Sequence, residues 1–225
     1  MQLKLHIDLK EIEKLDKFYR ANLVNSIVGI KQASLVGTKS KNKISNLAIF
    51  SSIVHLGSSP ALIGMFTRPV TIPPKQTLNN ILELKDFTIN HLNDSINIRG
   101  HSTAYKFEKN ESEFKECMLT EKYIENFNAP FVEESNISFG LSYIRHQKIK
   151  ENGVIFIIGS LKHILINEKS ISQNGEVNLM NLDSIGVAGN NTYYKLNKNK
   201  TLDYIKKEKR GILKNIVIDE KNKFN

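Results

Sequence analysis

The sequence feature that most constrains the fold is a pair of strand-like segments joined by a turn. Residues 137–148 and 154–166 are rich in Ile, Phe and Tyr, which are typical of β-strands. Asn152-Gly153 stands between them, and Asn-Gly is a dipeptide that strongly favours a β-hairpin turn. We therefore predict an antiparallel hairpin over residues 137–166.

Further strand-like segments and turns recur along the chain. A polar turn at residues 40–43 and a Gly-Ser-Ser-Pro turn at residues 57–60 separate such segments. Residues 68–75 contain three prolines, so we predict an irregular loop there. The predicted strands are 33–38, 44–54, 61–67, 86–91, 131–134 and 185–188, the predicted helices are 8–25 and 77–84, and residues 94–128 are predicted to combine helix and loop.

This pattern of elements indicates one β-rich domain. Many short strands in hairpins, with few helices, are typical of a closed or split barrel. A chain of 225 residues with 40% hydrophobic residues can form a substantial apolar core. We see no internal repeat and no linker, so we predict one domain over residues 1–205 and a basic tail over 206–225.

The chain carries no visible signal for export or membrane insertion. Its best apolar run, Val154–Ile158, is far shorter than the roughly 20 residues that a bilayer requires. Residues 1–8 alternate polar and apolar side chains and do not form the apolar centre of a signal peptide. The single Cys117 cannot form an intrachain disulfide. We expect a cytoplasmic protein, no membrane partner and a buried, inert thiol.

The net charge of +9 raises the question of a nucleic-acid partner. Much of the excess lies in lysines between residues 195 and 214. Aromatic residues do not interleave with these lysines as a base-stacking surface would require. We therefore expect a solvated basic tail and no specific nucleic-acid partner.

Several common catalytic and metal-binding motifs are missing. The sequence contains no Gly-x-Gly-x-x-Gly after a strand, no Walker-type phosphate loop and no Gly-x-Ser-x-Gly. No pair of its six histidines has metal-ligand spacing with a companion carboxylate or thiolate. These absences disfavour a Rossmann domain, a P-loop NTPase and an α/β hydrolase, and we predict no metal site.

Polar residues between positions 68 and 80 suit a phosphate group. Arg68 offers a guanidinium, and charge-assisted hydrogen bonds to phosphate are strong. Thr77, Asn79 and Asn80 stand at the start of a predicted helix, where free N–H groups favour an anion. Each residue alone is about as easily read as a cap or a surface residue. Together they suggest the phosphate of flavin mononucleotide (FMN).

The preceding strand suits the ring of the same cofactor. Asn46, Ser51 and Ser52 offer hydrogen-bond donors and acceptors for the pyrimidine edge of the flavin. Ala48, Phe50 and Val54 offer apolar contacts for the body of the ring.

The order and spacing of these residues resemble the flavin reductase-like domain family, the FMN-binding split barrels. The resemblance covers roughly residues 15 to 205. Two positions differ from the family pattern: Gln76 stands where relatives often have His, and Ser59-Pro60 stands where they usually have two prolines. The matching elements are Thr38, Asn46–Ser52, Ser59-Pro60-Ala61, Arg68-Pro69, Thr77 with Asn80-Ile81, Phe87 with Asn90, His101–Tyr105, Ser112–Phe114, Ala129–Ser135, Ile158-Gly159 and Gly189 with Tyr193-Tyr194.

The resemblance implies a mainly β fold: an FMN-binding split β-barrel with Greek-key-like connections and a few peripheral helices. It also implies a homodimer with FMN at the interface. The flavin would take hydride from NADH or NADPH and pass electrons to free flavin or to a partner oxygenase. The implied site residues are Arg68, Thr77, Asn79 and Asn80 for the phosphate, Asn46, Ala48, Ser51 and Ser52 for the ring, and His101 and Thr103 as catalytic candidates near the nicotinamide.

Two other functions stay open from the sequence. A non-catalytic FMN-binding protein or electron carrier would have the same FMN site without oxidising NAD(P)H. A nucleic-acid-binding barrel would depend on the lysine-rich tail.

Overall fold

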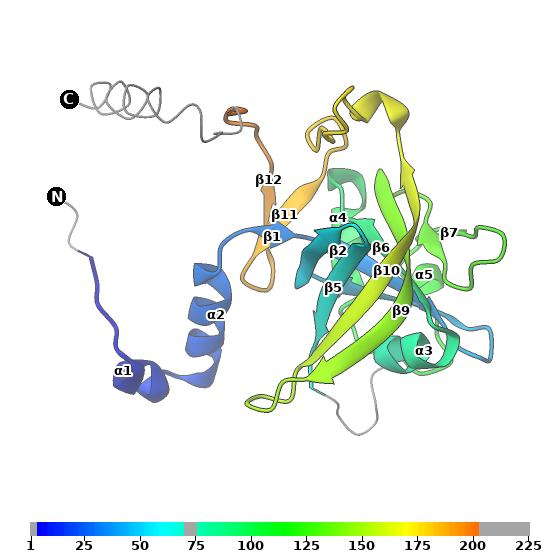
Figure 1. Cartoon of the computed structure of the whole chain (residues 1–225). Helices are drawn as coiled ribbons and strands as arrows, with labels where there is room; N and C mark the ends of the chain where they lie inside the picture. The colour runs from blue at the N-terminus through cyan, green and yellow to red at the C-terminus, as the bar shows by residue number, and fades with distance from the viewer. Residues whose placement is uncertain (1–3, 70–75, 203–225) are drawn as a thin grey trace.

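Most strands of the chain belong to one seven-stranded antiparallel sheet. The computed structural model describes residues 4–69 and 76–202 (Figure 1). The strand order in the large sheet is β3-β2-β6-β9-β10-β5-β4. The bounds are β2 Ser34–Lys39, β3 Ser45–Phe50, β4 Ile53–Ser58, β5 Ala61–Thr67, β6 Asp86–His91, β9 Ile137–Lys148 and β10 Ile155–Ile166. The predicted mainly β fold is confirmed.

The large sheet is rolled so that its two edge strands meet. β3 and β4 lie at opposite ends of the strand order, yet only Ser51 and Ser52 separate them in the chain. This link spans roughly 10 Å at most, whereas seven strands laid flat would separate the edges by roughly 29 Å. The N–H of Phe66 on β5 also donates to the carbonyl oxygen of Ser52, 2.9 Å away. The sheet is therefore a barrel, and we call the junction at Ser51–Ser52 the seam.

The seam corrects one predicted strand. Residues 44–54 were predicted to form a single strand, but β3 ends at Phe50 and β4 begins at Ile53. At the seam the chain leaves its partner β2 and turns to pair with β5. Local strand propensity does not report such a change of partner. The predicted turn at 57–60 is also shorter in the structure, because β4 continues to Ser58.

The predicted hairpin over residues 137–166 is confirmed and forms the centre of the sheet. β9 and β10 have twelve residues each and pair from Lys148 opposite Ile155 to Ile137 opposite Ile166. The connecting loop is closed by a hydrogen bond from the N–H of Ile149 to the carbonyl oxygen of Val154, at 2.7 Å. Gly153 adopts a φ of 75° in this loop, a conformation that glycine accepts readily.

The two faces of the sheet pack into different hydrophobic cores. Adjacent residues of a strand point to opposite faces, and Leu35 and Val36 of β2 belong to separate clusters. Leu78 and Ile81 of α3 (Gln76–Leu84) pack into the cluster of Val36. Phe114 of α5 (Glu113–Glu116) packs into the cluster of Leu35. The buried Cys117 lies in this second cluster, and burial raises the pKa of its thiol.

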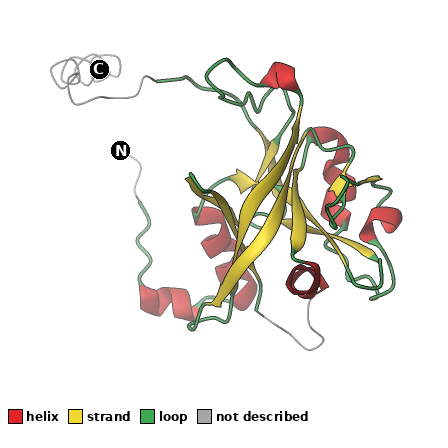
Figure 2. Cartoon of the chain, turned by 45° about the vertical axis from the view of Figure 1, so that its right-hand side comes forward, coloured by secondary structure: helices red, strands yellow, loops and turns green. Residues whose placement is uncertain are grey.

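Shorter elements surround the barrel. A three-stranded sheet has the order β1-β11-β12, and β7 pairs with β8. Figure 2 shows the helices at the periphery of the strands. The bounds are β1 Lys31–Gln32, β7 Glu121–Lys122, β8 Phe131–Val132, β11 Ile185–Ala188, β12 Thr192–Lys195, α4 Asn97–Ser102, η1 Asp94–Ile96 and η2 Glu168–Ser170.

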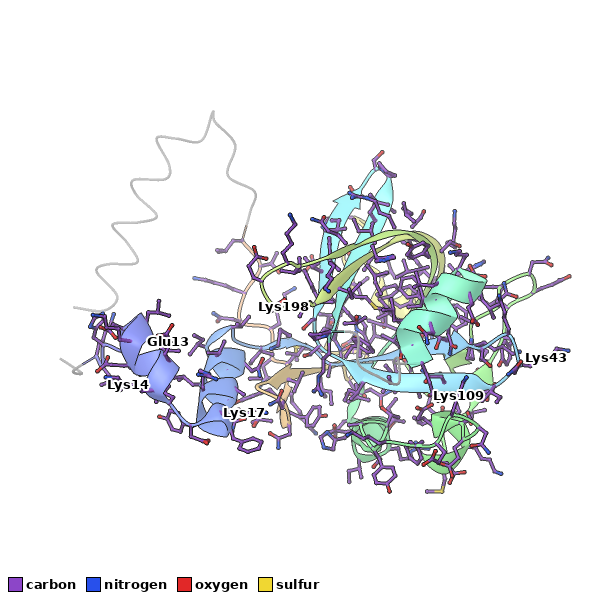
Figure 3. The ribbon with its side chains drawn as sticks, turned by 90° about the horizontal axis from the view of Figure 1, so that it is seen from below. Glu13, Lys14, Lys17, Lys43, Lys109 and Lys198 are labelled. Atoms are coloured by element: carbon purple, nitrogen blue, oxygen red, sulfur yellow. The ribbon has the colours of Figure 1, made fainter. Side chains whose placement is uncertain are left out.

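The predicted helix over residues 8–25 is two helices, α1 (Leu9–Lys14) and α2 (Lys17–Ile27). Asp16 interrupts it, because its carboxylate accepts the N–H groups of Phe18 and Tyr19 and so starts a new helix. Neither helix contains a buried residue. Figures 1 and 3 show both standing away from the barrel.

Within residues 4–69 and 76–202, no helix is long and apolar enough to cross a membrane. The predicted tail at 206–225 lies outside the described residues. Among the lysines that precede it, Lys195 and Lys198 form exposed ion pairs with Asp94 and Glu176.

Candidate functional site

A cavity of about 680 Å³ lies beside the seam. Its walls come from the ends of β3 and β5, the start of α3, the end of α4 and the N-terminal helix α2. Two other cavities, of about 300 and 780 Å³, contain none of the predicted site residues. We refer to the cavity beside the seam as the seam cavity.

The seam cavity brings together six of the predicted site residues. They come from four separate stretches of sequence, so it is the barrel that makes them neighbours. The six are Ala48, Ser51, Ser52, Arg68, Thr77 and Thr103. Their roles in ligand binding stay predictions.

Two further predicted residues, Asn46 and Asn80, lie buried behind the wall of the cavity. The Asn46 amide donates to the hydroxyl oxygens of Thr38 and Thr77, each at 3.2 Å. The Asn80 amide donates to the same oxygen of Thr38, at 3.1 Å. Because the Thr77 oxygen accepts from Asn46, its own O–H can donate to a ligand. The two asparagines therefore hold the start of α3 against β2 and β3.

The remaining two predicted residues do not line the seam cavity. Asn79 is exposed on α3. The His101 Nδ1 lies 2.7 Å from the hydroxyl of Tyr193, and the two rings meet edge to face. Burial raises the pKa of Tyr193, so its phenol stays protonated at neutral pH. In this arrangement His101 joins α4 to β12.

Thr103 lines the cavity with its hydroxyl already engaged. Its O–H donates to the carbonyl oxygen of Gly100, 2.8 Å away, at the end of α4. The oxygen keeps a free lone pair, so Thr103 can accept a hydrogen bond from a ligand. Donating a proton would require the bond to Gly100 to break.

Among the described residues that line the seam cavity, the charged side chains are all cations. Arg68 and Lys31 are among its described lining residues, and none of those residues is Asp or Glu. In the part of the chain that the structure describes, no three His, Cys, Asp or Glu side chains gather as a metal site requires. The seam cavity is therefore suited to an anionic organic ligand.

One wall of the cavity was missed by the sequence analysis. It consists of residues from α2, from β1 and from the turn between β11 and β12. Of these, only Gly189 belongs to the elements that resemble the family, and the sequence analysis gave it no role in the site. Gly189 in that turn has a φ of 63° and lies close to Ser26 on α2. The residues of this wall are Ala21, Asn25, Lys31, Gly189 and Asn190.

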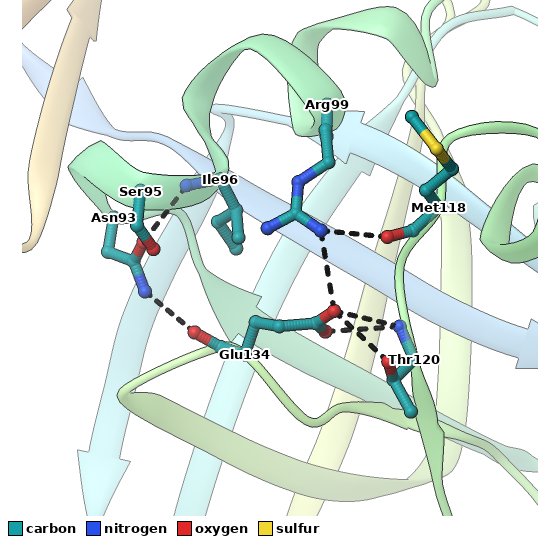
Figure 4. A network of polar contacts seen from close by, with 7 residues as sticks. All are labelled: Asn93, Ser95, Ile96, Arg99, Met118, Thr120 and Glu134. Atoms are coloured by element: carbon teal, nitrogen blue, oxygen red, sulfur yellow. Dashed lines mark hydrogen bonds and ion pairs between the residues drawn. The ribbon is translucent and has the colours of Figure 1, made fainter.

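A network of polar contacts fixes α4, the helix that precedes Thr103 (Figure 4). Arg99 donates to the carbonyl oxygen of Met118 at 2.8 Å and forms an ion pair with Glu134 at 3.6 Å. The Glu134 carboxylate also accepts from the N–H and O–H of Thr120, both at 3.1 Å. These contacts tie α4 to the segments that flank β7 and β8.

Comparison with known proteins identifies relatives of the whole barrel. The model of the flavin reductase like domain matches residues 30–178. A split-barrel protein of Shewanella frigidimarina, assigned as a flavin reductase, is 35% identical, with a TM-score of 0.86 over 90% of this chain and 100% of that chain. An uncharacterised Aquifex aeolicus protein is 26% identical over 182 residues, covering 80% of this chain and 90% of that protein.

A more distant solved structure shares the fold. Nitrilotriacetate monooxygenase component B of Bacillus cereus is 21% identical, with a TM-score of 0.79 over 90% of this chain and 100% of that chain. The predicted split-barrel fold is thus confirmed.

Proposed function

The chain belongs to the flavin reductase-like domain family, and on that premise we propose that it is an FMN-dependent oxidoreductase with its flavin in the seam cavity. The family and the solved neighbours support a flavin cofactor and a flavin reductase-type function. The observation that carries the proposal is the lining of the cavity, which combines cations, hydroxyl groups and apolar side chains and has no carboxylate among its described residues.

The phosphate of FMN would bind where Arg68 and Thr77 face the cavity. α3 begins at Gln76, and the first N–H groups of a helix have no partner within the helix and attract anions. The Thr77 hydroxyl is free to donate, since its oxygen accepts from Asn46. Arg68 adds a permanent positive charge, and its side chain is exposed, so it can move to contact a phosphate.

The ring of FMN would lie along the end of β3 and the seam. Ser51 and Ser52 link β3 to β4 and line the cavity, so their hydroxyl groups can reach the pyrimidine edge, whereas the Ser52 carbonyl oxygen already accepts from Phe66. Ala48, Phe50 and Phe66 provide apolar surface in the same wall. Bound FMN supplies the chemistry, the acceptance of a hydride from NADH or NADPH, and the protein positions the ring.

We also propose that a second copy of the chain completes the site. Val24 and Ile27, three residues apart and therefore neighbours on one face of α2, are 44% and 73% exposed. Large apolar side chains exposed together mark interaction surfaces. Ala21 and Asn25 of the same helix line the seam cavity, so a copy seated on α2 would border the flavin. The single unpaired thiol supports placing this dimer in the cytoplasm.

The reaction is tested by anaerobic mixing of the FMN-loaded protein with NADH and, separately, with NADPH. An oxidoreductase of this type bleaches the flavin absorbance with one or both donors and then reduces added free flavin. If FMN binds but neither donor bleaches it, the protein is an electron carrier. If no FMN binds even in excess, the proposed function is wrong.

A further inference from the structure

The seam cavity is lined by two cations that come from two different elements. Arg68 follows β5, whereas Lys31 lies in β1, in the small sheet with β11 and β12 (Figure 1). Among the described residues that line the cavity, no acidic side chain neutralises either of them. Oxidised FMN carries its negative charges on the phosphate alone, so a cation that is too far away to reach the phosphate has no partner in the oxidised cofactor.

The register of β2 and β3 gives the distance between the two ends of the cavity. Asn46, which bonds Thr77, pairs with Thr38 at one end of the ladder, and Phe50 pairs with Ser34 at the other. The four residue-to-residue steps from Asn46 to Phe50 span roughly 13 Å along the strand. Lys31 lies three residues before Ser34, beyond the Phe50 end. The phosphate end at Thr77 and the Lys31 end are therefore too far apart for one phosphate to reach both.

The structure holds Lys31 in place at this end. Its main chain pairs with Val187 of β11. Its ammonium donates to the carbonyl oxygen of Asn25 in the last turn of α2, at 3.4 Å. A Lys ammonium has three N–H donors, so two are left for a ligand. Ser51 and Ser52, which are proposed to hold the ring, emerge at the same end of the ladder.

We propose that Lys31 pairs with the negative charge that the flavin ring gains on reduction, so that the site binds reduced FMN more tightly than oxidised FMN. This inference rests on the proposed function. Hydride from the nicotinamide donor adds to ring atom N5, the donor leaves as oxidised nicotinamide, and the electron pair of the hydride appears as negative charge at N1 and the adjacent oxygen. Reduced FMN then has one anionic group for Arg68 and one for Lys31.

The consequence concerns what happens after reduction. A site that favours the reduced form retains its flavin and passes electrons on from the bound state. A site without this preference releases reduced flavin more readily. Lys31 therefore favours a protein that keeps reduced FMN bound over one that releases it as a diffusible product.

The test measures dissociation constants of oxidised FMN and of dithionite-reduced FMN by anaerobic ultrafiltration of the full chain. The wild type should bind reduced FMN about tenfold more tightly, as expected for one charge-assisted hydrogen bond. For a two-electron couple this preference corresponds to a rise of about 30 mV in reduction potential. Lys31→Met should remove the preference, and Lys31→Arg should keep most of it.

Lys195→Met is the matched control, because it removes the same charge from the same small sheet and Lys195 does not line the cavity. It should keep the preference. Equal weakening of both redox forms in Lys31→Met, with a normal circular dichroism spectrum, would assign Lys31 to the phosphate or to structure and overturn the inference. If Lys31→Met keeps the wild-type ratio between the dissociation constants of oxidised and reduced FMN, the inference is also overturned, even if the variant binds NADH more weakly. If the wild type binds neither form, the proposed function itself fails.

Discussion

The side-chain amide of Asn46 donates to the hydroxyl oxygen of Thr77, 3.2 Å away, and so joins β3 to the first turn of α3. Asn46 is buried and makes a second bond, to Thr38. The pair therefore fixes the helix start at which the flavin phosphate is proposed to bind.

Asn46→Ala should weaken both the fold and FMN binding. Two hydroxyl oxygens lose a donor, which should lower the free energy of unfolding by about 1–3 kcal/mol. FMN affinity should fall because Thr77 is no longer held. Urea unfolding and flavin fluorescence titration measure the two effects. Thr77→Val, which removes the hydroxyl and keeps the shape, should weaken FMN binding with less loss of stability. If both variants bind FMN with wild-type affinity, the start of α3 at Thr77 is not the phosphate site.

Gly37→Ala should destabilise the barrel. A Cβ at this position would fall on the carbonyl oxygen of Pro130, which cannot move freely because it is main chain. Overpacking of this kind costs about 1–3 kcal/mol or more. Gly57→Ala is the control, because its Cβ would meet its nearest neighbour at 3.5 Å, an ordinary contact. Chemical denaturation should show a large loss in the free energy of unfolding for Gly37→Ala and a small change for Gly57→Ala. Equal denaturation midpoints for the two variants would contradict the close packing of Gly37 on β2 against Pro130.

The half-buried His91 should make stability depend on pH. Burial lowers the pKa of His91 from 6.5 to about 4. Between these pH values the unfolded chain binds a proton that the folded chain does not, so the free energy of unfolding falls as pH drops from 6.5 towards 4. Above pH 6.5 His91 is neutral in both the folded and the unfolded chain, so the free energy of unfolding is no longer reduced by its protonation.

His91→Gln should therefore flatten the pH profile in that window. The substitution should cost more stability at pH 7 than at pH 5, measured by urea unfolding at both values. Glu113, whose pKa burial raises, changes stability in the opposite direction as pH rises. Because both proteins contain Glu113, the difference between them isolates His91. A difference that does not change with pH would mean that His91 titrates normally in the fold.

The proposed dimer should depend on α2. Replacing Val24 and Ile27 together by Asp places charges on its exposed apolar surface. Sedimentation velocity should then report a monomer, with FMN bound more weakly. Ile98→Asp is the control, because Ile98 is 83% exposed and lies on α4, outside this surface. A wild type that sediments as a monomer, or a variant that stays dimeric, would exclude this interface.

Local sequence patterns were sufficient to predict most strands. The β9–β10 hairpin was predicted from its composition and from Asn152-Gly153. The break at Ser51–Ser52 could not be predicted in this way, because it arises when the barrel closes and β4 pairs with β5. The interruption at Asp16 was missed because a second cap inside an apolar repeat is a weak signal.

The site was predictable only in part. Ser51, Arg68 and Thr77 are close enough in the sequence to form a recognisable pattern, and the fold brings them to one cavity. Lys31 reaches that cavity only through the pairing of β1 with β11, which no local pattern reports. His101 was predicted near the nicotinamide, but its ring contacts Tyr193 and does not line the cavity.

The most direct test of the FMN assignment compares the binding of FMN and of riboflavin, which lacks the phosphate, to the wild type and to Arg68→Met. Arg145→Met serves as the control, because Arg145 lies on β9 and does not line the seam cavity. We predict that Arg68→Met weakens FMN binding at least about tenfold, as expected for the loss of a charge-assisted bond, and leaves riboflavin affinity unchanged. Equal affinity of Arg68→Met and the wild type for FMN would contradict a flavin phosphate at this end of the seam cavity.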